Sequence, residues 1–98
     1  MSLKKKYLKS KPVCKVSFEF VPETLETTQS VEILGEFSNW EPVSMRKVKS
    51  AFTRTIDLEA GKNYQFRYRI NGELWLNDEA ADEYVPNGIA GDNSVVTV

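Results

Sequence analysis

The sequence contains no histidine, which removes the commonest general base, the commonest metal ligand and the base of Ser-His and Cys-His pairs. Its one cysteine, Cys14, cannot form a disulfide within the chain. No run of apolar residues approaches the roughly 18 needed to span a membrane. We therefore expect a protein that is not an enzyme, has no catalytic residues, uses no metal or other cofactor and has no membrane partner.

The sequence also has little net charge. The sequence has thirteen Lys and Arg residues and fourteen Asp and Glu residues, so its formal charge is −1. This charge produces no overall field that would attract a phosphate backbone. Five of the lysines lie within residues 4–11, and this stretch has no apolar segment typical of a secretory signal. We expect residues 1–12 to be a basic flexible segment, the protein to be cytoplasmic, and nucleic acid not to be a partner.

What is present is enough apolar material for one core. Of the 98 residues, 41% are hydrophobic and 28% are charged, as in a single folded domain, which we assign to residues 13–98. Short stretches alternate between apolar and polar residues with the two-residue period of a half-buried strand. The expected strands are residues 13–20, 31–35, 43–47, 52–58, 64–70, 73–76 and 94–98. Strands of this length, separated by turn residues, predict an all-β antiparallel β-sandwich.

Two predicted loops, at residues 71–72 and 77–83, have distinctive compositions. Asn71-Gly72 follows the strongest predicted strand and is typical of a type I′ hairpin turn, in which both central residues have positive φ. Residues 77–83 are acidic, and paired carboxylates can serve glycoside hydrolysis or calcium binding. Their spacing matches neither use, so we interpret this segment as a solvated acidic loop.

The most distinctive residues are two tryptophans on this β scaffold. Trp40 lies in a turn segment and Trp75 just after the hairpin turn. An indole attracts the flat C–H face of a sugar ring, while Arg67 and Asn93 could bind its hydroxyl groups. The alternative is that one or both tryptophans pack in or over the core, as large aromatic residues of small domains usually do.

Several segments carry a family resemblance. They are VEILGEFSNW at residues 31–40, FTRTIDL at 52–58, YQFRYRING at 64–72 with Trp75, and the ending GDNSVVTV at 91–98. Together they resemble carbohydrate-binding module family forty-eight, which includes the amino-terminal domains of isoamylases and glycogen branching enzymes and the glycogen-binding domain of the AMP-activated protein kinase beta subunit. The resemblance covers about residues 13–98 and implies an immunoglobulin-like β-sandwich of the early-set type.

The resemblance also implies a function. In the glycogen-binding members an α-1,4-linked glucan stacks on two tryptophans, at positions matching Trp40 and Trp75, and binds basic and asparagine side chains, at positions matching Arg67 and Asn93. We therefore expect a non-catalytic module for glycogen or starch-like glucan, with a glycogen-metabolising enzyme as a further expected partner. The alternative function is a protein-interaction or regulatory domain that packs on such an enzyme or self-associates without binding sugar.

Overall fold

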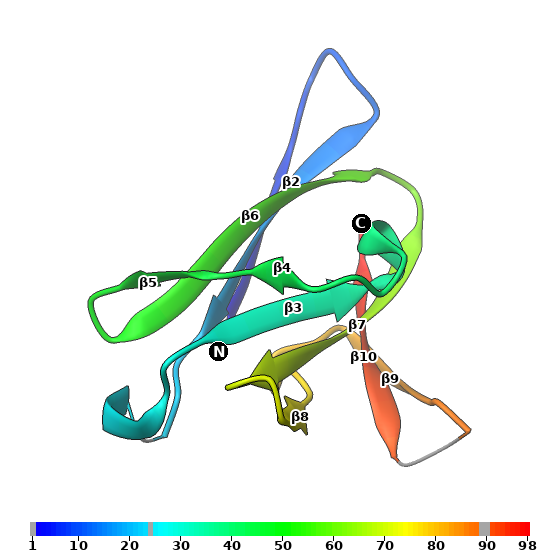
Figure 1. Ribbon diagram of the computed structural model, residues 1–98. Coiled ribbons are helices and arrows are strands. Elements are labelled where there is room, and N and C mark those ends of the chain that lie inside the picture. Colours follow the sequence, from blue (N-terminus) through cyan, green and yellow to red (C-terminus); the bar gives the residue numbers. More distant parts are fainter. Residues whose placement is uncertain (1, 24, 89–90) are drawn as a thin grey trace.

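The computed structural model describes residues 2–23, 25–88 and 91–98, and the strands within them form two antiparallel sheets (Figure 1). The first sheet has the order β1-β2-β6-β5. Its strands are β1 (Ser2–Tyr7), β2 (Val13–Phe20), β6 (Ala51–Glu59) and β5 (Arg46–Val48). Among the described residues the only helices are two 3-10 turns, η1 (Leu25–Thr27) and η2 (Glu36–Ser38), and neither is long and apolar enough to cross a membrane.

The second sheet has the order β4-β3-β7-β10-β9, with β8 also paired to β7. Its strands are β3 (Val31–Gly35), β4 (Val43–Ser44), β7 (Asn63–Ile70), β8 (Leu74–Leu76), β9 (Glu83–Pro86) and β10 (Asp92–Thr97). The prediction of an all-β antiparallel sandwich is confirmed.

The core lies between the sheets and follows from the alternation in the sequence. Val16 and Phe18 of β2 are fully buried, as are Phe66 and Tyr68 of β7. The rings of Phe18 and Phe66 meet edge to face with centroids 5.1 Å apart, and those of Phe66 and Tyr68 with centroids 5.7 Å apart. Because every second residue of β7 faces this core, Gln65, Arg67 and Arg69 lie on the outer face of the second sheet.

Part of the amino-terminal segment forms a strand, which the sequence pattern did not predict. Ser2–Tyr7 form the edge strand β1, which pairs along β2, and Leu3 packs against the core. Lys5 also reaches the other sheet, where its Nζ lies 2.7 Å from a carboxylate oxygen of Asp82. Lysines are common on edge strands because their charge discourages pairing with a further chain. A lysine-rich stretch can therefore be an edge strand as well as a solvated tail.

The predicted strand at residues 43–47 is divided between the two sheets. β4 pairs with β3, whereas β5 pairs with β6 in the opposite sheet. Met45 lies at the crossing point, where its side chain is buried and its backbone N–H donates to the Val31 carbonyl at 2.9 Å. The chain thus changes sheets at Met45, the one buried residue of this segment.

The acidic segment at residues 77–83 is not wholly solvated, which corrects the prediction. Asp78 is completely buried, accepts a hydrogen bond from the Tyr68 hydroxyl at 2.6 Å and receives another at Oδ1 from the Ala80 N–H. Its backbone N–H donates to Ser94 Oγ at 2.9 Å. These contacts attach the segment to the second sheet. The segment leads into β9, a strand that the sequence pattern did not predict.

Candidate functional site

The backbone around Trp40 is held in an unusual conformation. After β3 the chain makes the short turn η2, and both Asn39 and Trp40 then have positive φ, 57° and 62°. Positive φ is costly for a bulky residue and persists only where the surrounding contacts impose it. Here the Trp40 N–H donates to the Gly35 carbonyl at 2.8 Å, and Ser38 Oγ donates to the Glu41 carbonyl at 2.9 Å.

Two further contacts fasten this turn to the sandwich. Phe37 packs against Phe18 of the core, with ring centroids 5.8 Å apart, and Glu36 accepts a hydrogen bond from the Gln65 backbone N–H at 2.6 Å. Gly35 has no room for a side chain, since a Cβ there would lie 2.7 Å from both the Gln65 carbonyl oxygen and the Phe37 ring. The turn is thus anchored, yet Trp40 stays 39% exposed.

Trp75 reaches the outer face of the sheet because of the hairpin register. Asn71 and Gly72 have φ of 53° and 72°, which confirms the predicted positive φ at both positions, and the Glu73 N–H closes the turn on the Ile70 carbonyl at 3.0 Å. Strand pairing, however, begins with Ile70 opposite Leu74, so Glu73 is an extra residue in the turn and the strand starts one residue later than predicted.

The three-residue loop from Asn71 to Glu73 sets which way the indole points in this sequence. It aligns Trp75 with Arg69 on the outer face, whereas pairing of Ile70 with Glu73 would have aligned Trp75 with the buried Tyr68. Trp75 is 39% exposed, and its indole lies near two guanidinium groups, with the central carbons of Arg67 and Arg69 at 5.7 and 5.6 Å from its centroid. These distances allow cation–π attraction.

The two arginines have different partners. Arg69 donates from both Nε and a terminal nitrogen to Oε1 of Glu32 on β3, at 3.0 and 2.8 Å. Arg67 has a buried Nε with no hydrogen-bond partner within the described chain. Arg69 is therefore fixed by the protein, while Arg67 retains hydrogen-bonding capacity beside Trp75.

A row of side-chain amides lies next to Arg67. Asn93 is 8% exposed; its amide nitrogen donates to Gln65 Oε1 at 3.0 Å, and its Oδ1 accepts from Asn87 Nδ2 at 3.4 Å. This arrangement uses one donor and one acceptor of Asn93 inside the protein. Gln65 was not singled out in the sequence, although its position two residues before Arg67 puts it on the same strand face.

All four residues singled out in the sequence border one shallow depression of about 490 Å³ on the outer face of the second sheet. Its lining consists of Trp40, Gln65, Arg67, Trp75, Pro86, Asn87 and Asn93. We call it the tryptophan depression. Gln65, Pro86 and Asn87 were missed by the sequence analysis, and the last two lie in a segment whose strand was not predicted.

Two side chains with reactive groups, Cys14 and Tyr68, lie in the core. Cys14 is fully buried, and no cluster of three or more metal-ligating side chains occurs in residues 2–23, 25–88 and 91–98. The buried hydroxyl of Tyr68 has a pKa raised well above its ordinary value, first by burial and then by the neighbouring Asp78 carboxylate. It therefore remains a protonated structural donor.

Comparison with solved structures places the fold among known domains. The chain superposes with a TM-score of 0.79 and 13% sequence identity on the enterobactin esterase FES from Shigella flexneri, solved in the presence of 2,3-di-hydroxy-N-benzoyl-serine. The alignment covers 98% of this chain but only 32% of the esterase chain, so the likeness concerns the fold of one part of that enzyme. No curated protein matches the sequence.

A family model gives a more specific result. The model described as the glycogen recognition site of AMP-activated protein kinase matches residues 23–97, a span that contains every residue of the tryptophan depression. The family resemblance seen in the sequence is thereby confirmed, and the chain belongs to this family of glycogen-recognition domains.

Proposed function

We propose that the chain is a non-catalytic module that binds an α-1,4-linked glucan of the glycogen or starch type in the tryptophan depression. The observation that carries this proposal is the presence of two tryptophans, each 39% exposed, at the border of one polar depression. Large aromatic side chains of a small domain are usually packed away, and exposing two of them beside hydrogen-bonding groups suits a ligand with an apolar face and a polar rim.

In this proposal the residues have distinct roles. Trp40 and Trp75 stack on glucose rings, because dispersion and the hydrophobic effect draw the C–H face of a pyranose onto an indole. Arg67 donates hydrogen bonds to hydroxyl groups beside Trp75. Asn93, whose amide is oriented by Gln65 and Asn87, offers its remaining donor and acceptor capacity to the same rim.

The affinity should be low. The depression is shallow and a stacked sugar leaves much of its surface in water, so only a small buried area is available to offset the entropy lost on association. Dissociation constants for short oligosaccharides should fall on the order of micromolar to millimolar. Glycogen presents many chain ends, so it should bind more tightly through multivalency if several modules are held together.

Native affinity electrophoresis tests the proposal. Gels containing glycogen or soluble starch should retard the chain, whereas gels containing dextran, an α-1,6-linked glucan, should retard it much less. Equal mobility in all gels would contradict glucan binding, and equal retardation by dextran would contradict the linkage preference.

A second candidate function is a packing module attached to or recruited by an enzyme. One observation favours it: the similar fold in the Shigella flexneri structure forms 32% of a longer enzyme chain. Sedimentation of the chain with and without a glycogen branching enzyme tests it. A complex that forms without glucan, combined with unretarded migration in glycogen gels, would favour packing over sugar binding.

A further inference from the structure

A groove lies on the other side of the β7–β8 hairpin from Trp75. Because side chains alternate along a strand, Leu74 and Leu76 point away from the face that carries Trp75. They border a groove of about 620 Å³, larger than the tryptophan depression and within the size range of ligand-binding pockets. We propose that this groove, which we call the hairpin groove, binds a basic peptide segment by seating an aliphatic side chain flanked by Lys or Arg. The inference does not depend on glucan binding.

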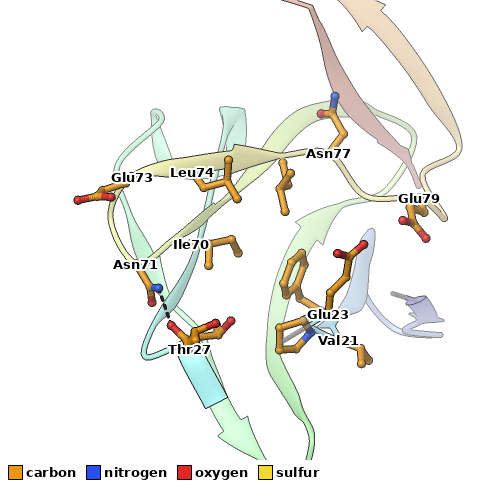
Figure 2. A pocket seen from close by; sticks show the side chains of 13 residues that line it. Val21, Glu23, Thr27, Ile70, Asn71, Glu73, Leu74, Asn77 and Glu79 are labelled. Atoms are coloured by element: carbon orange, nitrogen blue, oxygen red, sulfur yellow. Dashed lines mark hydrogen bonds between the residues drawn. The ribbon is translucent and has the colours of Figure 1, made fainter. Parts of the chain in front are cut away.

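The groove has two walls from distant parts of the chain. One is the hairpin, with Ile70 and Leu74, and the other is the segment after β2, with Val21 and Glu23 (Figure 2). Figure 2 shows Glu73 and Glu79 near opposite ends of the groove.

Asn71 ties the two walls together at one end. Its Oδ1 accepts from the backbone N–H groups of Gln29 and Ser30 at 2.8 and 3.1 Å, and its Nδ2 donates to the Thr27 carbonyl at 2.9 Å. Its own backbone N–H donates to the Ser30 carbonyl at 2.9 Å. These bonds hold the hairpin against residues 27–30 at one end of the groove, which lowers the ordering cost of binding there.

The apolar part of the groove is unusually open. Leu74 is 56% exposed and Val21 is 44% exposed, and both belong to the small set of large hydrophobic side chains that the described chain leaves open to water. Their neighbours Phe20 and Ile70 are buried and provide an apolar floor. Exposed apolar side chains on both walls of one groove are typical of an interaction site.

The charge of the groove selects the partner. Glu23, Glu73 and Glu79 line it, and none of the described residues that line it is Lys or Arg. A lining with this excess of negative charge attracts a positively charged ligand, and a peptide with aliphatic side chains between basic ones matches both the floor and the rim. A glucan fits less well, because the one aromatic ring of the lining, Phe20, is only 2% exposed and offers no stacking surface.

Nuclear magnetic resonance titration of the isotope-labelled full chain tests the proposal. The probe is the acetylated and amidated peptide Lys-Lys-Leu-Leu-Lys-Lys, compared with one peptide in which Glu replaces every Lys and one in which Ser replaces both Leu. The basic apolar peptide should shift the methyl signals of Leu74 and Val21 and the side-chain amide of Asn71, with a dissociation constant of roughly 0.1–1 mM. The indole N–H of Trp75 should not move, and both comparison peptides should bind at least about fivefold more weakly.

Substitutions at the groove separate its two contributions. Leu74→Ser and Glu73→Lys should each weaken peptide binding at least about threefold, since the first removes an apolar contact and the second reverses a charge at the rim. Glu41→Lys is the matched control, because it changes the net charge equally at an exposed residue outside the groove and should leave the affinity unchanged. Leu74 and Glu73 are exposed, so we expect both variants to fold. Unchanged signals of the core residues in the same spectra check this.

Other occupants give different results. Shifts at Leu74 that grow with protein concentration in the absence of peptide would assign the groove to a second copy of the chain and overturn the proposal. Shifts there on addition of maltoheptaose would assign it to a sugar, with the same consequence. Equal binding of the acidic peptide, or no groove shifts at millimolar basic peptide, would also overturn it, whether or not the tryptophan depression binds glucan.

Discussion

Trp75 lies directly opposite Arg69 across the β7–β8 ladder, and Arg69 in turn lies opposite Glu32 across the β3–β7 ladder. The three side chains form a row over three neighbouring strands, in which Glu32 holds both Nε and a terminal nitrogen of Arg69, and the guanidinium carbon is 5.6 Å from the centroid of the indole. Glu32 lies outside the depression, yet through Arg69 it limits the orientations that Trp75 can adopt.

The first prediction concerns this row. Glu32→Gln weakens the charge-assisted hydrogen bonds to Arg69, so the guanidinium and the indole beside it become less well oriented. Affinity for maltoheptaose should fall about two- to fivefold by isothermal titration, and the steady-state fluorescence anisotropy attributable to Trp75 should decrease. The control is Glu59→Gln, which removes a surface pair with Lys62 elsewhere. A Glu32→Gln variant whose affinity and anisotropy match those of the wild type would show that Arg69 is positioned without Glu32.

The second prediction concerns the hairpin register. Deleting Glu73 leaves Asn71 and Gly72 as a two-residue turn, which still pairs Ile70 with Leu74 and Arg69 with Trp75. Affinity for maltoheptaose should therefore stay within about twofold of the wild-type value. Insertion of one glycine after Leu74 should instead disturb the outward orientation of Trp75 and abolish its contribution. Strong loss of binding on deletion of Glu73 would show that the three-residue loop itself, and not strand pairing alone, orients Trp75.

The third prediction concerns the buried pair of Tyr68 and Asp78. Tyr68→Phe removes the hydroxyl that donates to the fully buried Asp78 side chain, and an unsatisfied buried acceptor is costly. Urea denaturation at pH 7 should show a loss of about 1–3 kcal/mol in the free energy of unfolding. Tyr7→Phe, at an exposed residue of β1, should change it by no more than about 0.5 kcal/mol. Equal stability of the two variants would mean that the hydroxyl of Tyr68 has no net stabilising role.

The fourth prediction concerns pH. Burial alone would raise the pKa of Asp82, but hydrogen bonds from Lys5 and the Thr97 N–H, together with the charge of Lys5, outweigh it and lower the pKa below the ordinary value. Because the folded-state pKa is lower than the unfolded-state pKa, the ionised carboxylate stabilises the fold above the unfolded pKa. That contribution is lost as the pH falls through the folded pKa.

Asp82→Asn should accordingly lower the free energy of unfolding by about 0.5–1 kcal/mol near pH 7, a size typical of a partly exposed ion pair. The difference from the wild type should shrink as the pH falls below about 4. Denaturation curves recorded between pH 3 and 7 measure it, with Asp57→Asn, at an exposed pair with Lys15, as the comparison. A difference that grows toward acid pH would contradict the lowered pKa.

The strands with a clear alternation could be predicted from the sequence, as β2, β3, β6 and β7 show. The elements that could not be predicted depend on contacts between distant segments. β1 was not predicted because its lysines interrupt the alternation of apolar and polar residues. The burial of Asp78 depends on hydrogen bonds with the hydroxyl groups of Tyr68 and Ser94. The cytoplasmic location inferred from the amino-terminal segment stays a prediction.

The same distinction holds at the candidate site. Trp40, Arg67, Trp75 and Asn93 were identified from residue types and a family pattern, and they border one depression. Gln65 and Glu32 emerged only from the packed structure, because their importance rests on which side chains they meet across neighbouring strands. The outward direction of Trp75 likewise depends on a one-residue difference in the turn, which residue types alone do not determine.

The most direct test of the central claim is isothermal titration of maltoheptaose into the wild type, Trp40→Ala, Trp75→Ala and Val48→Ala. Val48 is a comparably exposed apolar residue on β5 of the opposite sheet and serves as the matched control. Loss of one stacking platform should weaken binding by about tenfold or more, since burying apolar area the size of one large side chain contributes roughly 1.5–3 kcal/mol, whereas Val48→Ala should bind like the wild type. Unchanged affinity in both tryptophan variants would contradict glucan binding in the tryptophan depression.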